Sequence, residues 1–263
     1  MSTRSERWPE GTPCWVDLST TDQQAAISFY STLFGWHVQD TGEEFGHYGI
    51  AMLGGQSVAG VGELQPGQAG PAAWTTYLAS NDVDKTCEAI TSAGGAVVMP
   101  VMEVGTSGRM AIAQDPTGAF FGVWDAGDMP GSTIVNEPGA VGWNECRTRD
   151  PQRARDFYAE VFGYTFTKME GDAEYWTIDG TGPGSTVGGL CPLDPSVPAE
   201  IPAHWMTYFV AADTDAAVAT VSANGGRLQM GPWDTPFGRM AVVTDPQGAL
   251  FSIAGMPPES TES

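Results

Sequence analysis

Basic side chains are scarce in this chain. Its 263 residues include 11 Lys and Arg against 32 Asp and Glu, which gives a formal net charge of −21 at pH 7. A surface this acidic repels nucleic-acid backbones and anionic lipid, so we expect neither nucleic acid nor a membrane as a partner. The simplest interpretation of the acidity is that it keeps a cytoplasmic protein soluble.

Cysteine and long apolar runs are also scarce. The four cysteines form no C-x-x-C pair, so the sequence predicts neither a disulfide framework nor a zinc site. The first residues, MSTRSERWPEG, lack the apolar region of a secretory signal, and no run of about 18 apolar residues follows. We therefore expect the reducing cytoplasm as the compartment.

A long internal repeat is present instead. PCWVDLSTTDQQAAISFYSTLFGW around Trp15 matches VGWNECRTRDPQRARDFYAEVFGY around Trp143 at a spacing of 128 residues. Further on, AAWTTYLASNDVD matches AHWMTYFVAADTD at 131, and SGRMAIAQDPTGAFF matches FGRMAVVTDPQGALF at 130. This spacing indicates a duplicated domain and not a short-period solenoid. We predict domains over residues 12–126 and 140–256, joined by a linker over 127–139 that is rich in Gly and Pro.

Each half alternates between extended and helical patterns. In the first half a helix is predicted from Asp22 to Gly35 and another over 82–93, because apolar residues recur at three- and four-residue intervals between Asp caps and glycines. The other segments read as strands, so each half is βαβββ twice. The sequence predicts an α+β fold of four βαβββ units, with helices outside curved, mostly antiparallel sheets. The ends, up to about Glu10 and after Met256, are expected to fray.

Four of these features together resemble the vicinal oxygen chelate superfamily, which contains glyoxalase I, bleomycin-resistance proteins and extradiol dioxygenases. They are the strand followed by the D…FY…G helix, the Asp-capped second helix, the Gly-Gly turn, and the D-P-x-G turns at Asp115–Gly118 and Asp245–Gly248. The chain is most similar to two-domain glyoxalase-like proteins of actinobacteria. The resemblance implies two glyoxalase-like domains, each with a ligand-binding cup. We expect a monomer or a homodimer.

The resemblance also implies where a divalent metal would be held. The family's first-strand ligand falls on Trp15 and Trp143, and its last-strand Glu falls on Gly122 and Ser252. Its remaining ligand falls near Thr75 in one half and near residues 204–206 in the other. Indole, glycine and a serine hydroxyl are poor ligands for such ions, and the chain has only three histidines. We therefore predict no metal and no other cofactor. A metal enzyme using His47, Glu63 or His204 remains an alternative.

Strand alternation suggests what the cups contain instead. If Trp15 faces a cup, Asp17 does so too, and Trp143 likewise brings Glu145. Asp17 and Glu145 are thus the candidate general acid/base groups, unless they are merely solvated or paired with arginine. Trp15 and Trp143 could equally be core residues. Flat apolar walls suit a planar organic ligand. The candidate ligand-binding residues are Trp15, Tyr48, Trp74, Thr76, Tyr77, Arg109 and Trp124 in the first half, and Trp143, Trp176, Trp205, Tyr208, Trp233 and Arg239 in the second.

Two kinds of function fit this pattern. The first is a metal-independent enzyme acting on a small hydrophobic or aromatic metabolite, as in a tailoring step of secondary metabolism such as hydroxylation, cyclisation or rearrangement. The second is a protein that sequesters a planar drug, as bleomycin-resistance proteins do, with acidic groups and indoles attracting a cationic ligand. A metal-dependent glyoxalase or dioxygenase and a purely structural role are the remaining alternatives.

Overall fold

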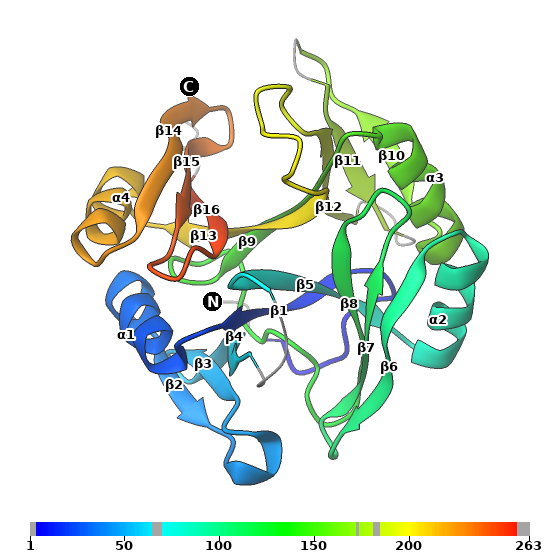
Figure 1. Ribbon diagram of the computed structural model, residues 1–263, viewed down its shortest axis with the longest axis horizontal. Helices are drawn as coiled ribbons and strands as arrows, with labels where there is room; N and C mark the ends of the chain where they lie inside the picture. The colour runs from blue at the N-terminus through cyan, green and yellow to red at the C-terminus, as the bar shows by residue number, and fades with distance from the viewer. Residues whose placement is uncertain (1–3, 65–69, 172–173, 181–184, 257–263) are drawn as a thin grey trace, which may run out of the picture.

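The computed structural model describes residues 4–64, 70–171, 174–180 and 185–256, and shows two mixed eight-stranded sheets with four α-helices (Figure 1). This confirms the predicted α+β fold of two glyoxalase-like halves. In spatial order the first sheet contains β2 (His37–Asp40), β3 (Gly49–Leu53), β4 (Gln56–Glu63), β1 (Pro13–Thr20), β5 (Ala73–Ser80), β8 (Phe120–Ala126), β7 (Gly108–Gln114) and β6 (Ala96–Val104).

The second sheet repeats this order. Its strands are β10 (Thr165–Lys168), β11 (Trp176–Asp179), β12 (Thr186–Pro192), β9 (Val141–Thr148), β13 (His204–Ala211), β16 (Leu250–Gly255), β15 (Gly238–Thr244) and β14 (Arg227–Thr235). Most neighbours are antiparallel. The parallel pairs are β1–β4 and β5–β8 in the first sheet, and β9–β12 and β13–β16 in the second.

The helices begin and end where the sequence places caps. In α1 (Gln23–Phe34) the Asp22 carboxylate accepts a hydrogen bond from the Ala25 amide, and Gly35 ends the helix at φ 73°. Asp150 and Gly163 do the same for α3 (Pro151–Phe162). The shorter helices α2 (Val83–Ser92) and α4 (Thr214–Ala223) are capped by Asp82 and Asp213. A 3₁₀ turn, η1 (Glu43–Phe45), precedes β3.

The two sheets share their cores. One apolar cluster joins α1 and its strands to β13, β15 and β16 of the other half, and a second joins α2 and its strands to α3 and β9. In Figure 1, α1 accordingly lies beside α4 and α2 beside α3. A tyrosine on the first helix of each half bonds to the other half. The hydroxyl of Tyr30 donates to Asp245 at 3.1 Å, and that of Tyr158 donates to Asp115 at 3.0 Å. The repeated FY and D-P-x-G motifs therefore hold the halves together.

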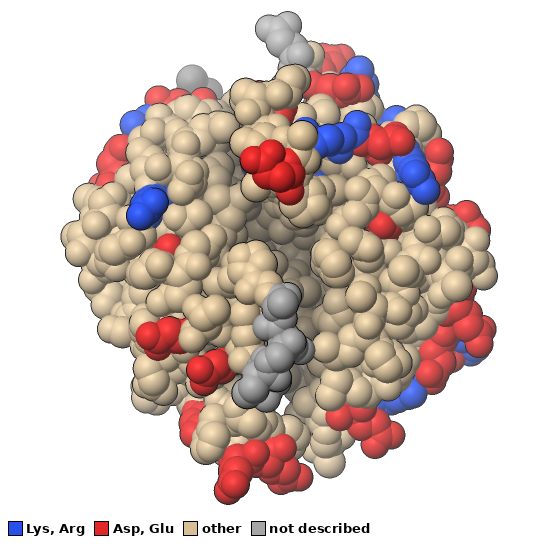
Figure 2. All heavy atoms as spheres, viewed as in Figure 1, with Lys and Arg blue, Asp and Glu red and all other residues tan. Residues whose placement is uncertain are grey.

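The N-terminal segment corrects one prediction. Residues 4–10 are not frayed, because the Trp8 indole donates to the Ser132 carbonyl at 3.1 Å and Arg7 pairs with Asp125 at 3.2 Å. Residues after Met256 lie outside the described part of the chain. Among the described helices none has the length and apolarity that crossing a membrane requires. Figure 2 shows acidic side chains mainly around the periphery of the visible face.

Candidate functional site

Strand alternation places Trp15 and Asp17 on the concave face of the first sheet. The alternate residues of β1, Val16 and Leu18, point to the opposite face and belong to the core shared with the other half. Trp15 instead packs with Tyr77 and Trp124 in a separate cluster. We call the concave face of the first sheet the first cup and that of the second sheet the second cup.

In the first cup, two tyrosines converge on Asp17. The hydroxyl of Tyr77 donates to Asp17 Oδ2 at 3.0 Å, and that of Tyr48 donates to the same oxygen at 3.3 Å. The Trp15 indole donates to the Tyr48 hydroxyl at 3.1 Å and so orients it. Among the hydrogen bonds of the described residues, none engages Asp17 Oδ1. The two hydroxyls thus hold one carboxylate oxygen of Asp17 in place.

The surroundings of Asp17 set its protonation. Burial raises the pKa of Asp17 to about 6, although the hydrogen bonds from Tyr77 and Tyr48 oppose that rise. Burial, together with the charge of Asp17, raises the pKa of both tyrosines well above the usual value, so they remain neutral donors. The site therefore combines a carboxyl that titrates close to neutral pH with two hydroxyls that do not ionise.

Glycines make the space for these tyrosines. A Cβ at Gly60, the β4 neighbour of Asp17, would lie 1.6 Å from the Tyr48 hydroxyl oxygen. A Cβ at Gly122, the β8 neighbour of Tyr77, would lie 2.1 Å from the Tyr77 ring. Real Cβ atoms essentially never come this close to another heavy atom. The Tyr77 ring therefore lies over Gly122, where the vicinal oxygen chelate family places its metal-binding Glu.

The residues present do not fit the family's metal. The sequence places the remaining ligand near Thr75 and near residues 204–206, but the structure aligns Trp15 with Tyr77 and Gly122, and Trp143 with Tyr208 and Ser252. The ligand positions on β5 and β13 are therefore Tyr77 and Tyr208. None of these side chains offers the carboxylate, imidazole or thiolate that divalent metals prefer. Throughout the described residues, no three His, Cys, Asp or Glu side chains are close enough to share an ion, so His47, Glu63 and His204 form no alternative site.

The second cup contains the same arrangement of an indole, two tyrosines and a carboxyl group, and in addition the guanidinium of Arg147. The Trp143 indole donates to Tyr175 at 2.9 Å, and the Tyr208 hydroxyl donates to Glu145 Oε1 at 3.0 Å. Arg147 Nε also donates to this oxygen, at 2.7 Å, and Arg147 Nη2 donates to the Tyr208 hydroxyl at 2.6 Å. Glu145 is only 4% exposed. It is therefore a buried, ion-paired carboxylate, unlike Asp17.

Four predicted ligand-binding residues lie outside both cups, and this corrects their placement. The indoles of Trp74 and Trp205 donate to Tyr30 and Tyr158 in the interdomain core. Thr76 donates to Asn144 at 2.9 Å where the two sheets meet. Trp176 is buried in the core under the guanidinium of Arg155. Each occupies the alternate strand position, facing the other sheet or a helix.

The two predicted arginines also point away from the cups. Arg109 Nη1 pairs with Asp84 in the first turn of α2 at 2.8 Å, and Arg239 Nε pairs with Asp215 in the first turn of α4 at the same distance. Their neighbours Met110 and Met240 face the cups instead. The arginines therefore attach helices to strands, which corrects their assignment as ligand-binding groups.

The other predicted residues do meet. Trp15, Asp17, Tyr48, Tyr77 and Trp124 share the first cup. Trp143, Glu145, Tyr208 and Trp233 share the second.

Sequence reasoning missed Tyr175 and Arg147. Tyr175 lies 127 residues after Tyr48 and directly before an equivalent strand, so the repeat itself could have identified it. Arg147 could have been found by extending the alternation from Glu145 by two residues.

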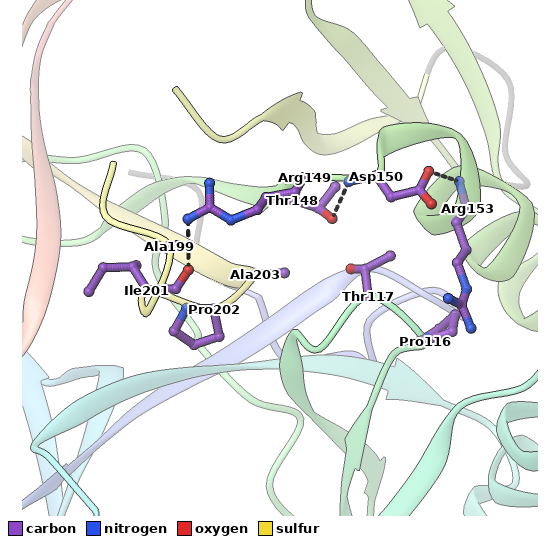
Figure 3. A pocket seen from close by; sticks show the side chains of 10 residues that line it. All are labelled: Pro116, Thr117, Thr148, Arg149, Asp150, Arg153, Ala199, Ile201, Pro202 and Ala203. Atoms are coloured by element: carbon purple, nitrogen blue, oxygen red, sulfur yellow. Dashed lines mark hydrogen bonds between the residues drawn. The ribbon is translucent and has the colours of Figure 1, made fainter. Parts of the chain in front are cut away.

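A cavity of about 340 Å³ lies elsewhere, between the halves (Figure 3). It opens beside the start of α3 and the D-P-T-G turn, and Arg149 donates across one side to the carbonyls of Pro198 and Ile201. None of the predicted site residues lines it. The lining residues are Pro116, Thr117, Thr148, Arg149, Asp150, Arg153, Ala199, Ile201, Pro202 and Ala203.

Similar proteins of known sequence match almost the entire chain. CFP32 of Mycobacterium bovis, which carries a provisional glyoxylase name, is 42% identical over 265 residues, covering 98% of this chain and 100% of the relative. The anthracycline biosynthesis protein DnrV of Streptomyces peucetius is 38% identical over 266 residues, covering 94% of each chain.

Solved structures share the fold at much lower identity. The Mn(II)-bound glyoxalase of Novosphingobium aromaticivorans superposes with a TM-score of 0.64 at 15% identity, over 95% of this chain and 84% of that one. The 2,3-dioxygenase LapB of Pseudomonas sp. KL28 gives 0.64 at 14% identity, over 97% and 96%. The sequence profile of the glyoxalase/bleomycin resistance protein/dioxygenase superfamily matches residues 14–123 and 133–253. The chain therefore belongs to this superfamily.

Proposed function

We propose that this protein is a metal-independent enzyme that uses Asp17 of the first cup as a general acid/base on a planar, largely hydrophobic metabolite. The observation that carries the proposal is the Asp17 carboxyl itself. It is half-buried beside the Trp15 indole, its pKa lies at about 6, and its Oδ1 takes part in none of the hydrogen bonds among described residues. General acid/base groups work best when their pKa is close to the working pH.

The chemistry that this arrangement supports is proton transfer. Asp17 Oδ1 takes a proton from an acidic C–H or O–H of the substrate, and the electron pair moves onto a substrate oxygen. Protonation of Asp17 weakens the hydrogen bonds that it accepts, which frees the hydroxyls of Tyr48 and Tyr77 to donate to the developing enolate or phenolate. Return of the proton to another atom completes a rearrangement or a ring closure without an oxidant or a reductant.

The relatives support the type of substrate. DnrV and the related DauV, each 38% identical, are named for anthracycline biosynthesis, and anthracyclines are planar polycyclic compounds. Trp15 and Trp124 are buried in the aromatic cluster of the first cup, at 5% and 6% exposure, so a ring system would have to lie beside them at Asp17. We therefore propose a substrate from aromatic secondary metabolism for this chain.

The pH dependence of conversion tests the role of Asp17. A panel of planar phenolic ketones is incubated with the protein in D₂O, and rearrangement or deuterium uptake is followed by mass spectrometry. For a converted compound, kcat/KM is expected to rise with pH through about pH 6 and then level off, because the base must be ionised. A profile without an ionisation in this region would contradict the assignment.

Metal removal tests the other half of the proposal. Dialysis against EDTA is expected to leave conversion unchanged, and added Mn²⁺ is expected not to raise it, because the family's ligand positions carry Trp15, Tyr77 and Gly122. Elemental analysis of the purified protein measures the metal directly. One tightly held divalent ion per domain would overturn metal independence.

A drug-sequestering protein is the second candidate. Trp143 and Trp233 of the second cup are only partly buried, and the chain carries a net charge of −21, so a planar cation could gain both cation–π and long-range attraction. The two candidates differ in turnover. A protein that binds planar cations tightly and converts no compound of the panel would favour sequestration.

A further inference from the structure

The two cups differ in the row of residues next to the acid. In the first cup Ser19 follows Asp17 on the same face of β1, with Gly62 and Ala73 as its strand neighbours. In the second cup the same three positions hold Arg147, Cys191 and His204. Three small uncharged residues thus correspond to three larger polar ones.

In the second cup this row covers the acid. Arg147 lies against Glu145 at 2.7 Å and against the Tyr208 hydroxyl at 2.6 Å. On the β13 side Met206, which is 1% exposed, adjoins Glu145, whereas the half-buried Thr75 occupies that position beside Asp17. A carboxylate that is buried and bonded to a guanidinium cannot readily take a proton from a ligand, because the ion pair stabilises its charged form.

In the first cup the same row leaves the acid reachable. Ser19 and Gly62 are half-buried and Ala73 is exposed, and Asp17 retains exposed surface next to them. The residues around Asp17 on this side are all uncharged: Ser19, Gly62, Ala73 and Thr75. An uncharged, flat edge of a ligand can therefore approach Asp17 over these residues without leaving a charge unpaired.

We infer that only the first cup accepts substrate, through an opening over Ser19, and that Arg147 closes the second cup as a structural copy. This inference rests on the proposed function in taking Asp17 as the group that the substrate reaches. It adds three points to that function: the path by which the substrate reaches Asp17, a preference for substrates with an uncharged planar edge, and the residue position that decides which cup accepts substrate.

Binding stoichiometry tests the inference without any need for turnover. The probe is 1-hydroxyanthraquinone, which is planar and uncharged, titrated against tryptophan fluorescence and by calorimetry. The wild-type chain is expected to bind one equivalent. Ser19→Arg, which copies Arg147 into the first cup, is expected to weaken binding by at least about tenfold, a loss of about 1.4 kcal/mol. Ser28→Arg on the exposed face of α1 adds the same charge outside the cup and is expected to bind like wild type.

The reverse exchange opens the second cup. Glu145→Gln combined with Arg147→Ser removes both charges together, so that no buried carboxylate is left unpaired, and is expected to raise the stoichiometry to two. Two equivalents in the wild type, one in the double variant, or wild-type affinity in Ser19→Arg would each overturn the inference. Failure of the proposed function shows separately, as unchanged turnover in Asp17→Asn, a variant that keeps the opening.

Discussion

Replacing Asp17 with asparagine is expected to reduce conversion of the substrate by about 10²- to 10⁴-fold, the range that general acid/base groups contribute. Asparagine has nearly the same shape and still accepts the hydrogen bonds of Tyr48 and Tyr77, but its amide cannot take up a proton at pH 7. The Kd of a bound substrate is expected to change little, because the walls of the cup remain. Single-turnover kinetics and calorimetry measure the two quantities separately.

Glu145→Gln is the matched control for this substitution. Glu145 is paired with Arg147 and 4% exposed, so it is expected to contribute nothing to turnover. Its loss is expected to lower stability instead. Equal losses of turnover in the two variants would indicate that both cups react. Full turnover in Asp17→Asn would remove the acid/base role altogether.

The stability of Asp17→Asn shows whether a loss of turnover comes from the missing acid/base group or from a folding defect. The pKa of Asp17 is raised from 3.8 to about 6 by burial, so the stability it contributes is present below about pH 4 and is lost as pH rises through 6. A rise of about two pKa units corresponds to about 3 kcal/mol, an upper bound for a carboxyl that keeps some contact with water. Urea unfolding at pH 8 is therefore expected to find Asp17→Asn more stable than wild type, with a smaller difference at pH 5.

The fold could be predicted from the sequence because its signals are local and occur twice. Asp22 and Gly35 cap one helix and Asp150 and Gly163 cap its copy, and each set recurs at the same spacing. What the repeat does not reveal is the pairing of the halves. Tyr30 bonds to Asp245 across 215 residues, and such a contact follows from how two cores pack and leaves no periodic pattern in the sequence.

The alternation of side chains along a strand predicts which residues of one strand share a face, and only this part of the candidate site could be predicted. Alternation placed Asp17 beside Trp15 and Glu145 beside Trp143, and the structure brings each pair together. It could not fix the face of β5 or β13, because a shift of one residue exchanges Tyr77 with Thr76, Tyr208 with Thr207 and Trp205 with Met206. That ambiguity is why Trp74, Thr76 and Trp205 were expected in the cups and lie in the core. Neither could alternation distinguish Arg109 from Met110 as the inward residue.

The two cups differ in how the surroundings of their acids stabilise charge. Glu145 is paired with Arg147, whereas none of the ion pairs among the described residues involves Asp17, and burial raises the pKa of Asp17, so its charged form is costly in the folded protein. Buried acids with such a raised pKa commonly occur at functional sites. In the second cup Arg147 offsets the cost, and the constellation becomes part of the structural framework.

Arg147→Ala is accordingly expected to destabilise the protein by about 3 kcal/mol or more, the usual result of leaving a buried carboxylate without its partner. Arg147 Nε lies 2.7 Å from Glu145 Oε1, and the Arg147 side chain is 20% exposed against 6% for Glu145. Urea unfolding at pH 7.5 measures the loss, which is expected as a lower midpoint with the same slope. Ser19→Ala at the equivalent position of the first cup is expected to change the free energy of unfolding by less than about 0.5 kcal/mol.

The double variant Glu145→Gln with Arg147→Ala shows whether the unpaired charge causes the loss. It is expected to recover much of the stability, because a neutral amide costs far less to bury than a carboxylate and still accepts the Tyr208 hydrogen bond. If Arg147→Ala were as stable as wild type, Glu145 would have another way to offset its charge, and the pair could not be what closes the second cup. An unstable double variant would instead point to lost packing of the Arg147 side chain against the Tyr208 ring, over which its guanidinium lies at 5.9 Å.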